Sequence, residues 1–348
     1  MLPCGTYSCN YSEDMAVLRT RSHWVLLIAF LVLLATVPMF AGYQWENFIT
    51  LVCFFVINAV GLNILLGYTG QVALGQAAFM AVGAYTSGIL TAKVGIPFMV
   101  ALPLAGLLAG AAGIIFGLPS VRVKGFYLAL VTLGAQFIII YIIEHLEITG
   151  GTDGMTCDFA SIGGLVLDTP TKIYWLVMAV TVILVFLAMN LMRTRVGRAF
   201  IAVRDNDIAA EVLGVNIARY KLLAFFIGCF YSGIAGALWA HYTTSLHPSQ
   251  FPLHNGIMYL GIIVVGGMGT MFGPIAGAIV MRGLDEVVMI AFPKLAEALP
   301  SLGANMAPAL GPMAFGLVFI LFLIFEPRGI AHGWRRLKSS IENWPFAY

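Results

Sequence analysis

Apolar runs long enough to cross a membrane alternate with short polar segments along most of the chain. A helix of about 20 apolar residues spans the hydrocarbon core of a bilayer. Ten runs approach or reach this length: Trp24–Gly42, Phe48–Leu66, Val72–Ala92, Phe98–Leu118, Phe126–Ile143, Ile173–Met192, Leu222–His241, Asn255–Val265, Gly273–Ala291 and Gly311–Phe325. The pattern predicts an all-α, polytopic integral membrane protein with about ten transmembrane helices.

One long polar interruption, residues 193–221, breaks this pattern. Asp205, Asn206 and Asp207 suit the start of a helix, because their side chains can accept hydrogen bonds from unpaired backbone N–H groups. Gly214 suits the position just after its end. We therefore predict a short helix of about two turns, roughly 12 Å long.

The predicted short helix has two unlike faces. At helical spacing its apolar positions are Ile208, Ala209, Val212 and Leu213, and its charged positions are Arg204, Asp207 and Glu211. No neighbouring segment obviously covers the apolar face. Two interpretations follow: the face packs against the chain's own helices, or it docks onto a separate subunit.

Two glycine-rich stretches, Gly61–Phe79 and Gly266–Gly277, interrupt apolar runs. They fit small-residue faces where helices pack closely, or broken helices whose freed backbone groups line a solute path. Whether some helices are discontinuous stays open at this point. The candidate residues for either role are Gly70, Gln71, Gly75, Gln76, Gly267, Gly269 and Gly273. A bulky residue at Gly75 or Gly269 should impair the protein where alanine is tolerated.

Composition and charge agree with a membrane protein. Hydrophobic residues make up 60% of the chain and charged residues only 10%, against about 25% charge in soluble domains. Cytoplasmic loops carry an excess of Lys and Arg. If the N-terminus is inside, all of the 18 basic residues fall on the inside except Lys93, Lys172 and Lys294 outside and Arg282 within a span. This predicts that both termini and residues 193–221 are cytoplasmic.

The predicted organisation has three parts: a mobile tail at 1–23, a transmembrane domain at 24–326 and a basic cytoplasmic tail at 327–348. The five cysteines are scattered and form no metal or disulfide pattern. No basic tract with interleaved aromatic residues suggests a nucleic-acid partner.

No motif for catalysis, a cofactor or a metal is found. Gly266–Gly273 lacks the Lys-Ser/Thr of a phosphate-binding loop, because Pro274 follows it. Ion-coupled carriers hold charged residues deep in the membrane, whereas the acidic residues here cluster at the ends of spans. An ATP-independent secondary transporter or a channel nevertheless stays open as a class for this protein.

Several motifs occur in the order of a known family. The first is G-R-A-x-x-A-V-R-D-x-D-x-A-A-E-x-L-G, from Gly197 to Gly214. The others are the two glycine-rich stretches, Leu118–Leu133 and Thr149–Gly154. Together they cover roughly residues 55–280. The chain resembles the permease subunits of branched-chain amino acid ABC importers, and among the two paired permeases it resembles the M-type partner.

The resemblance implies a function and partners. It implies a multi-pass protein of the bacterial plasma (inner) membrane, paired with a second permease, ABC ATPase subunits and an extracytoplasmic solute-binding protein. ATP and Mg²⁺ would bind the ATPase, so that this chain is not itself an enzyme and binds no cofactor. The implied ATPase-coupling residues are Arg198, Arg204, Asp207, Ile208, Ala209, Glu211, Val212 and Gly214. The solute stays open between branched-chain amino acids and urea or short amides, whose importers use similar permeases.

Overall fold

A computed structural model describes residues 42–163, 165–298, 307–326 and 328–334, together with scattered positions between 25 and 40 and position 336. Most of the predicted first span, Trp24–Gly42, and most of both predicted tails lie outside these residues. Each of the other predicted apolar runs lies mainly in helix in the part of the chain that is described, and Val72–Ala92 departs from this at its start.

The described chain is almost entirely helical, which confirms the all-α prediction. Its helices are α3 (Tyr43–Leu62), α4 (Gln76–Ala92), α5 (Phe98–Gly117), α6 (Phe126–His145), α7 (Pro170–Arg193), α8 (Arg195–Asp205), α9 (Asp207–Val212), α10 (Ile217–Thr243), α11 (Leu253–Gly266), α12 (Phe272–Ala298) and α13 (Ala307–Phe325). The strands are two residues each: β1 (Met155–Thr156), β2 (Ser161–Ile162), β3 (Leu165–Val166) and β4 (Ser245–Leu246). They pair antiparallel as β1 with β4 and β2 with β3.

Five segments among the described residues are long and apolar enough to cross a membrane: Tyr43–Tyr68, Phe98–Val121, Phe126–His145, Pro170–Arg193 and Ile217–Thr243. They fit a multi-pass membrane protein. The predicted total of about ten spans and the side on which the termini lie stay predictions.

Helix α10 is central to the bundle and packs against α3, α4 and α5. Small residues bring these helices close together: a Cβ built on Gly236 of α10 would lie 1.9 Å from the carbonyl oxygen of Met80 in α4. Close backbone contact of this kind is a common means of helix association inside a membrane, where water supplies no hydrophobic driving force.

The first glycine-rich stretch contains a break between α3 and α4. Helix α3 continues as a π-helical turn, η1 (Asn63–Tyr68), and residues 70–75 are non-helical. Helix α4 therefore begins at Gln76, and the predicted helical start at Val72 is wrong. Side chains of α6 hold the break, since Thr132 Oγ1 accepts from Leu74 N at 3.0 Å and Gln136 Oε1 accepts from Ala78 N at 2.7 Å.

Gly75 lies at this break, in close contact with α6. A Cβ at Gly75 would lie 2.4 Å from the backbone oxygen of Thr132. An alanine Cβ would therefore fit only if the backbone shifts, so the structure leads us to expect that alanine is poorly tolerated at Gly75, contrary to the expectation from the sequence.

The second glycine-rich stretch joins α11 to α12. Helix α11 has 14 residues, about 21 Å at 1.5 Å per residue, and is too short to cross a hydrocarbon core of about 30 Å by itself. Gly267 (φ 113°) and Gly269 (φ 70°) turn the chain in backbone conformations that favour glycine.

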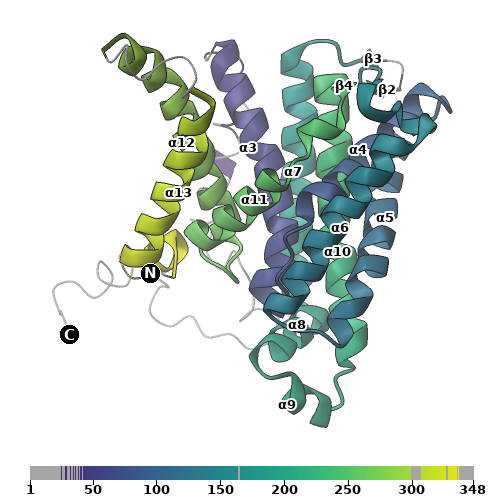
Figure 1. Ribbon diagram of the computed structural model, residues 1–348, viewed down its shortest axis with the longest axis vertical. Helices are drawn as coiled ribbons and strands as arrows, with labels where there is room; N and C mark the ends of the chain where they lie inside the picture. The colour runs from purple at the N-terminus through teal and green to yellow at the C-terminus, as the bar shows by residue number, and fades with distance from the viewer. Residues whose placement is uncertain are drawn as a thin grey trace.

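Residues 193–221 and the loop between α6 and α7 lie at opposite ends of the bundle (Figure 1). The first segment contains two helices, α8 and α9, where one was predicted. The loop carries strands β1 to β3, one of which pairs with β4 after α10. If residues 193–221 are cytoplasmic, this arrangement places the loop after α6 on the other side of the membrane; the side itself stays a prediction.

Candidate functional site

The short helix α9 is capped at both ends by the residues that its sequence offers. Asn206 is the N-cap, and its Oδ1 accepts a hydrogen bond from Ala209 N at 3.1 Å. Gly214 has a φ of 87°, and Val215 N donates to Ala210 O at 2.9 Å, closing the other end. Asp205 and Asp207 were alternative caps, and neither takes that position.

The apolar face of α9 points away from the rest of the chain. Ile208 is 70% exposed, Val212 83% and Leu213 82%. The buried residue is Ala210, on the opposite side. The interpretation that this apolar face packs against the chain's own described helices is therefore wrong.

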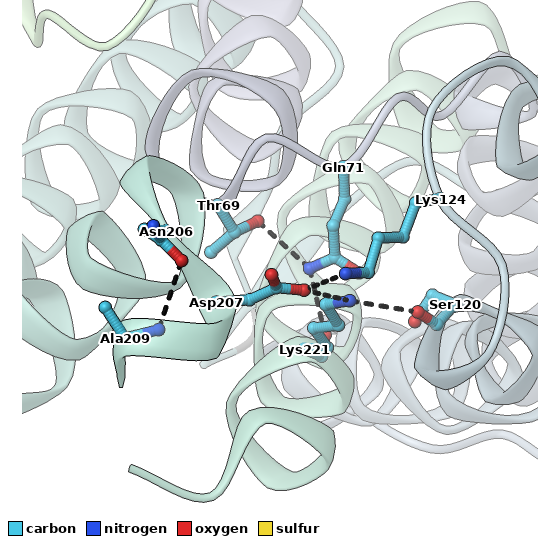
Figure 2. A network of polar contacts seen from close by, with 8 residues as sticks. All are labelled: Thr69, Gln71, Ser120, Lys124, Asn206, Asp207, Ala209 and Lys221. Carbon is cyan, nitrogen blue, oxygen red and sulfur yellow. Dashed lines mark hydrogen bonds and ion pairs between the residues drawn. The ribbon is translucent and has the colours of Figure 1, made fainter. Parts of the chain in front are cut away.

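Asp207 attaches α9 to two other elements through charge (Figure 2). Its carboxylate forms an ion pair with Lys124, in the loop before α6, and lies 4.0 Å from Lys221 Nζ at the start of α10. The hydrogen bond from Lys124 holds the pKa of Asp207 below its usual range. Lys221 Nζ also donates to Ser120 O at 3.4 Å.

A polar cavity of about 290 Å³ lies beside this ion pair. Gln71, from the break after α3, lines it, and Gln71 Nε2 donates to Thr69 Oγ1 at 3.0 Å and to Lys221 O at 3.3 Å (Figure 2). The cavity therefore lies where the first glycine-rich stretch meets residues 193–221, which contain the predicted coupling residues and are called the coupling segment below.

Arg204, at the end of α8, turns toward its own chain. Its guanidinium donates from NH1 to Gly67 O at 2.9 Å and from Nε and NH2 to Asp205 Oδ1 at 2.9 and 2.8 Å. Among the predicted coupling residues, Arg204 and Asp207 thus bind their own chain. The side chain of Arg204 is nevertheless 37% exposed, and the other six predicted residues are exposed as well: Arg198, Ile208, Ala209, Glu211, Val212 and Gly214.

Apart from Gly75, which is described above, the predicted glycine and glutamine residues lie in three places. Gly70, Gln71 and Gly269 lie against the coupling segment. Gln76 lies deeper in the bundle, where its Nε2 donates to Gly228 O at 3.2 Å and to Ser232 Oγ at 2.5 Å. Gly267 and Gly273 form the turn before α12, where a Cβ on Gly273 would lie 2.3 Å from Gly267 O.

Sequence reasoning missed four residues of this site: Asn63, Gly67, Lys124 and Lys221. The two lysines contributed to the charge pattern only as cytoplasmic markers. Their position at the ends of predicted spans, on the same side as Asp207, was the available signal for an ion pair. Among the described residues, no three His, Cys, Asp or Glu side chains gather as they would around a metal ion.

Residues 44–324 match the family described as the permease component of branched-chain amino acid transport systems. The high-affinity branched-chain amino acid transport system permease protein LivM of Escherichia coli is 33% identical over 298 residues, covering 76% of this chain and 70% of the relative. A probable branched-chain amino acid transport permease protein LivM of Methanocaldococcus jannaschii is 26% identical over 243 residues, covering 68% and 69%.

A more distant relative is named for another solute. The ribose import permease protein RbsC of Haemophilus influenzae is 25% identical over 297 residues, covering 80% of this chain and 88% of the relative. No solved structure matches. The two LivM relatives confirm the resemblance to the M-type permease, and the matched family covers most of the chain. The chain therefore belongs to the family of permease components of branched-chain amino acid transport systems.

Proposed function

We propose that this chain is the membrane permease subunit of an ATP-driven importer for branched-chain, hydrophobic amino acids in the bacterial inner membrane. It works with a second permease, ABC ATPase subunits that bind ATP and Mg²⁺, and an extracytoplasmic solute-binding protein. This chain binds no cofactor and catalyses no reaction.

The observation that carries the proposal is the exposed apolar face of α9. Ile208, Val212 and Leu213 stand out on a helix whose other side is fastened by Asp207 and Ala210. Burial of a large aliphatic side chain stabilises an interface by about 1.5–3 kcal/mol. These three side chains give α9 the means to dock into a groove of an ATPase subunit.

The mechanism follows from how α9 is held. ATP-driven closure of the ATPases would move the docked helices α9 and α8. The ion pair with Lys124 would pass this motion to the loop before α6, and Lys221 would pass it to α10. The bundle would then alternate between openings on its two sides, which is how transporters of this kind move a solute without a continuous pore.

The test replaces Ala209, an exposed residue of α9, by arginine. Burying an unpaired charge at an interface costs about 3–5 kcal/mol, enough to weaken docking by about two orders of magnitude or more. We expect Ala209→Arg to insert and pair with the second permease, while the ATPase co-purifies poorly and ATP-dependent uptake collapses.

Ala209→Ser is the matched control, because it adds a polar atom without charge or bulk. It should keep both ATPase co-purification and ATP-dependent uptake. Normal co-purification and uptake by Ala209→Arg would contradict the coupling role of α9. Uptake that continues in vesicles depleted of ATP would instead favour a secondary transporter or channel.

The RbsC relative motivates a test of the solute. Proteoliposomes that contain the whole transporter should take up radiolabelled leucine, and unlabelled isoleucine and valine should compete. Competition by urea, short amides or ribose, but not by leucine, would assign a different solute to the same permease architecture.

A further inference from the structure

We propose that Arg204 is a positioning residue that joins the coupling segment to both glycine-rich breaks. The proposal rests on the proposed function and deepens it, because it names the link through which motion of α8 and α9 reaches the membrane helices. Sequence reasoning assigned Arg204 to the docking surface, whereas its contacts are internal.

The side chain of Arg204 lies against three glycines. It donates to Gly67 O at 2.9 Å. A Cβ built on Gly70 would lie 3.2 Å from Arg204 Cγ, and a Cβ built on Gly269 would lie 3.0 Å from Arg204 NH1. Two of these glycines belong to the break after α3 and one to the turn before α12, so a single side chain contacts both.

Asn63 fastens the same two segments to each other. It is fully buried in the π-helical turn, where its Oδ1 accepts from Gly269 N at 3.0 Å and its Nδ2 donates to Thr270 O at 2.8 Å. The π-turn and the turn before α12 are thereby one hydrogen-bonded unit. Single π-turns inside helices are frequent at functional sites.

Arginine suits this place for a chemical reason. Its planar guanidinium presents several donors in fixed directions and stays charged at all working pH values. Asp205 Oδ1 accepts from Nε and NH2, which leaves NH1 aimed at Gly67 O. A lysine ammonium cannot hold this geometry, because it is a single point charge on a flexible stem.

The consequence is a direct route from α8 to the broken backbone. Arg204 is the last residue but one of α8, and α9 follows after Asn206 alone. A displacement of α9 by a docked ATPase moves Arg204, and Arg204 carries the unit of Asn63, Gly67 and Gly269 with it. Because Arg204 does not belong to the exposed apolar face of α9, its loss should uncouple the transporter without undocking the ATPase.

The test uses the whole transporter in proteoliposomes and compares Arg204→Ala, Arg204→Lys and Arg195→Ala. Arg195 is exposed on the first turn of the same helix and contacts neither glycine stretch, so it controls for loss of a charge on α8. The measured quantity is ATP hydrolysed per solute molecule taken up, together with ATPase co-purification and permease abundance.

We expect Arg204→Ala to keep ATPase co-purification and basal hydrolysis while ATP per solute rises at least about tenfold, the effect of losing one charge-assisted hydrogen bond. Arg204→Lys should fall between Arg204→Ala and wild type, and Arg195→Ala should match wild type. If Arg204→Ala does not accumulate, the same ratio is read from Arg204→Lys.

Two results would overturn the proposal. One is an unchanged ratio of ATP to solute in both Arg204 variants. The other is loss of ATPase co-purification in either variant, which would make Arg204 a docking residue. Failure of the proposed function is seen separately, through Ala209→Arg, because that variant leaves every contact of Arg204 in place.

Discussion

At the residue scale, the charged group that depends most on its partners is the buried ammonium group of Lys221. The residue is only 5% exposed, and a buried ammonium group is costly unless an opposite charge or hydrogen-bond acceptors lie near it. Asp207 supplies the charge at 4.0 Å and Ser120 O the acceptor at 3.4 Å. One carboxylate thus serves both Lys221 and the more exposed Lys124.

We predict that Asp207→Asn loosens α9 by removing this carboxylate. The lost ion pair with the exposed Lys124 is worth about 0.2–1 kcal/mol, and the uncompensated charge of Lys221 adds to it. Hydrogen-exchange protection of residues 207–213 should fall at least about fivefold, equivalent to about 1 kcal/mol. The measurement is exchange on the purified permease, read by mass spectrometry.

The pH dependence of this effect has a defined sign. The pKa of Asp207 is lower in the folded protein than in the unfolded chain. Its carboxylate therefore stabilises the folded state fully above the unfolded pKa of about 3.9. This stabilisation is lost as pH falls through the lower pKa of the folded state. The difference between wild type and Asp207→Asn should therefore be the same at pH 7 and pH 5.

Asp168→Asn is the matched control, because Asp168 pairs with Lys172 at 2.8 Å on the exposed surface at the other end of the bundle. It should leave protection of residues 207–213 unchanged. Equal protection in Asp207→Asn and wild type at pH 7 would show that the ion pair does not hold α9.

At the element scale, the contact between the start of α4 and the middle of α6 depends on one missing side chain. A Cβ at Gly75 would lie 2.4 Å from Thr132 O, and backbone atoms cannot move aside as a flexible side chain does. We predict that Gly75→Ala separates α4 from α6 and destabilises the protein by about 1–3 kcal/mol, the usual effect of overpacking.

Gly134→Ala is the control for this prediction. Gly134 lies two residues after Thr132 on α6, yet a Cβ there would meet nothing within 4 Å. Alanine should be neutral or stabilise the helix by up to about 1 kcal/mol. Thermal unfolding of both variants in detergent should show a lower midpoint for Gly75→Ala alone; equal midpoints would mean that the break tolerates a wider separation.

At the scale of the whole molecule, the bundle has two unlike ends that should face opposite sides of the membrane. The basic segment with α8 and α9 lies at one end and the loop after α6 at the other (Figure 1). In a background without native cysteines, we predict that a cysteine at Thr194 is shielded from an impermeant thiol reagent in intact cells, whereas one at the exposed Thr152 reacts.

Permeabilised cells provide the control, since both cysteines should react there. Labelling of Thr194→Cys from outside, or protection of Thr152→Cys, would reverse the topology. The experiment also decides on which side of the membrane an ATPase could reach α9.

The sequence by itself determined the elements that depend on local chemistry. Apolar runs of membrane length become helices wherever the chain is described, because a backbone in lipid must satisfy its hydrogen bonds within its own segment. The cap of α9 at Asn206 and its end at Gly214 also followed from local preferences. Family motifs indicated the assignment that the relatives then confirmed.

Only the tertiary structure decided which distant residues meet. Arg204 and Gly67 are bonded across 137 positions, and Asn63 and Gly269 across 206. No local sequence pattern predicts which residues form such pairs. The non-helical residues 70–75 are another example, since side chains of α6, 58 positions away, accept hydrogen bonds from Leu74 N and Ala78 N there. The apolar face of α9 is exposed because nothing among the described residues covers it, which is the observation behind its proposed docking role.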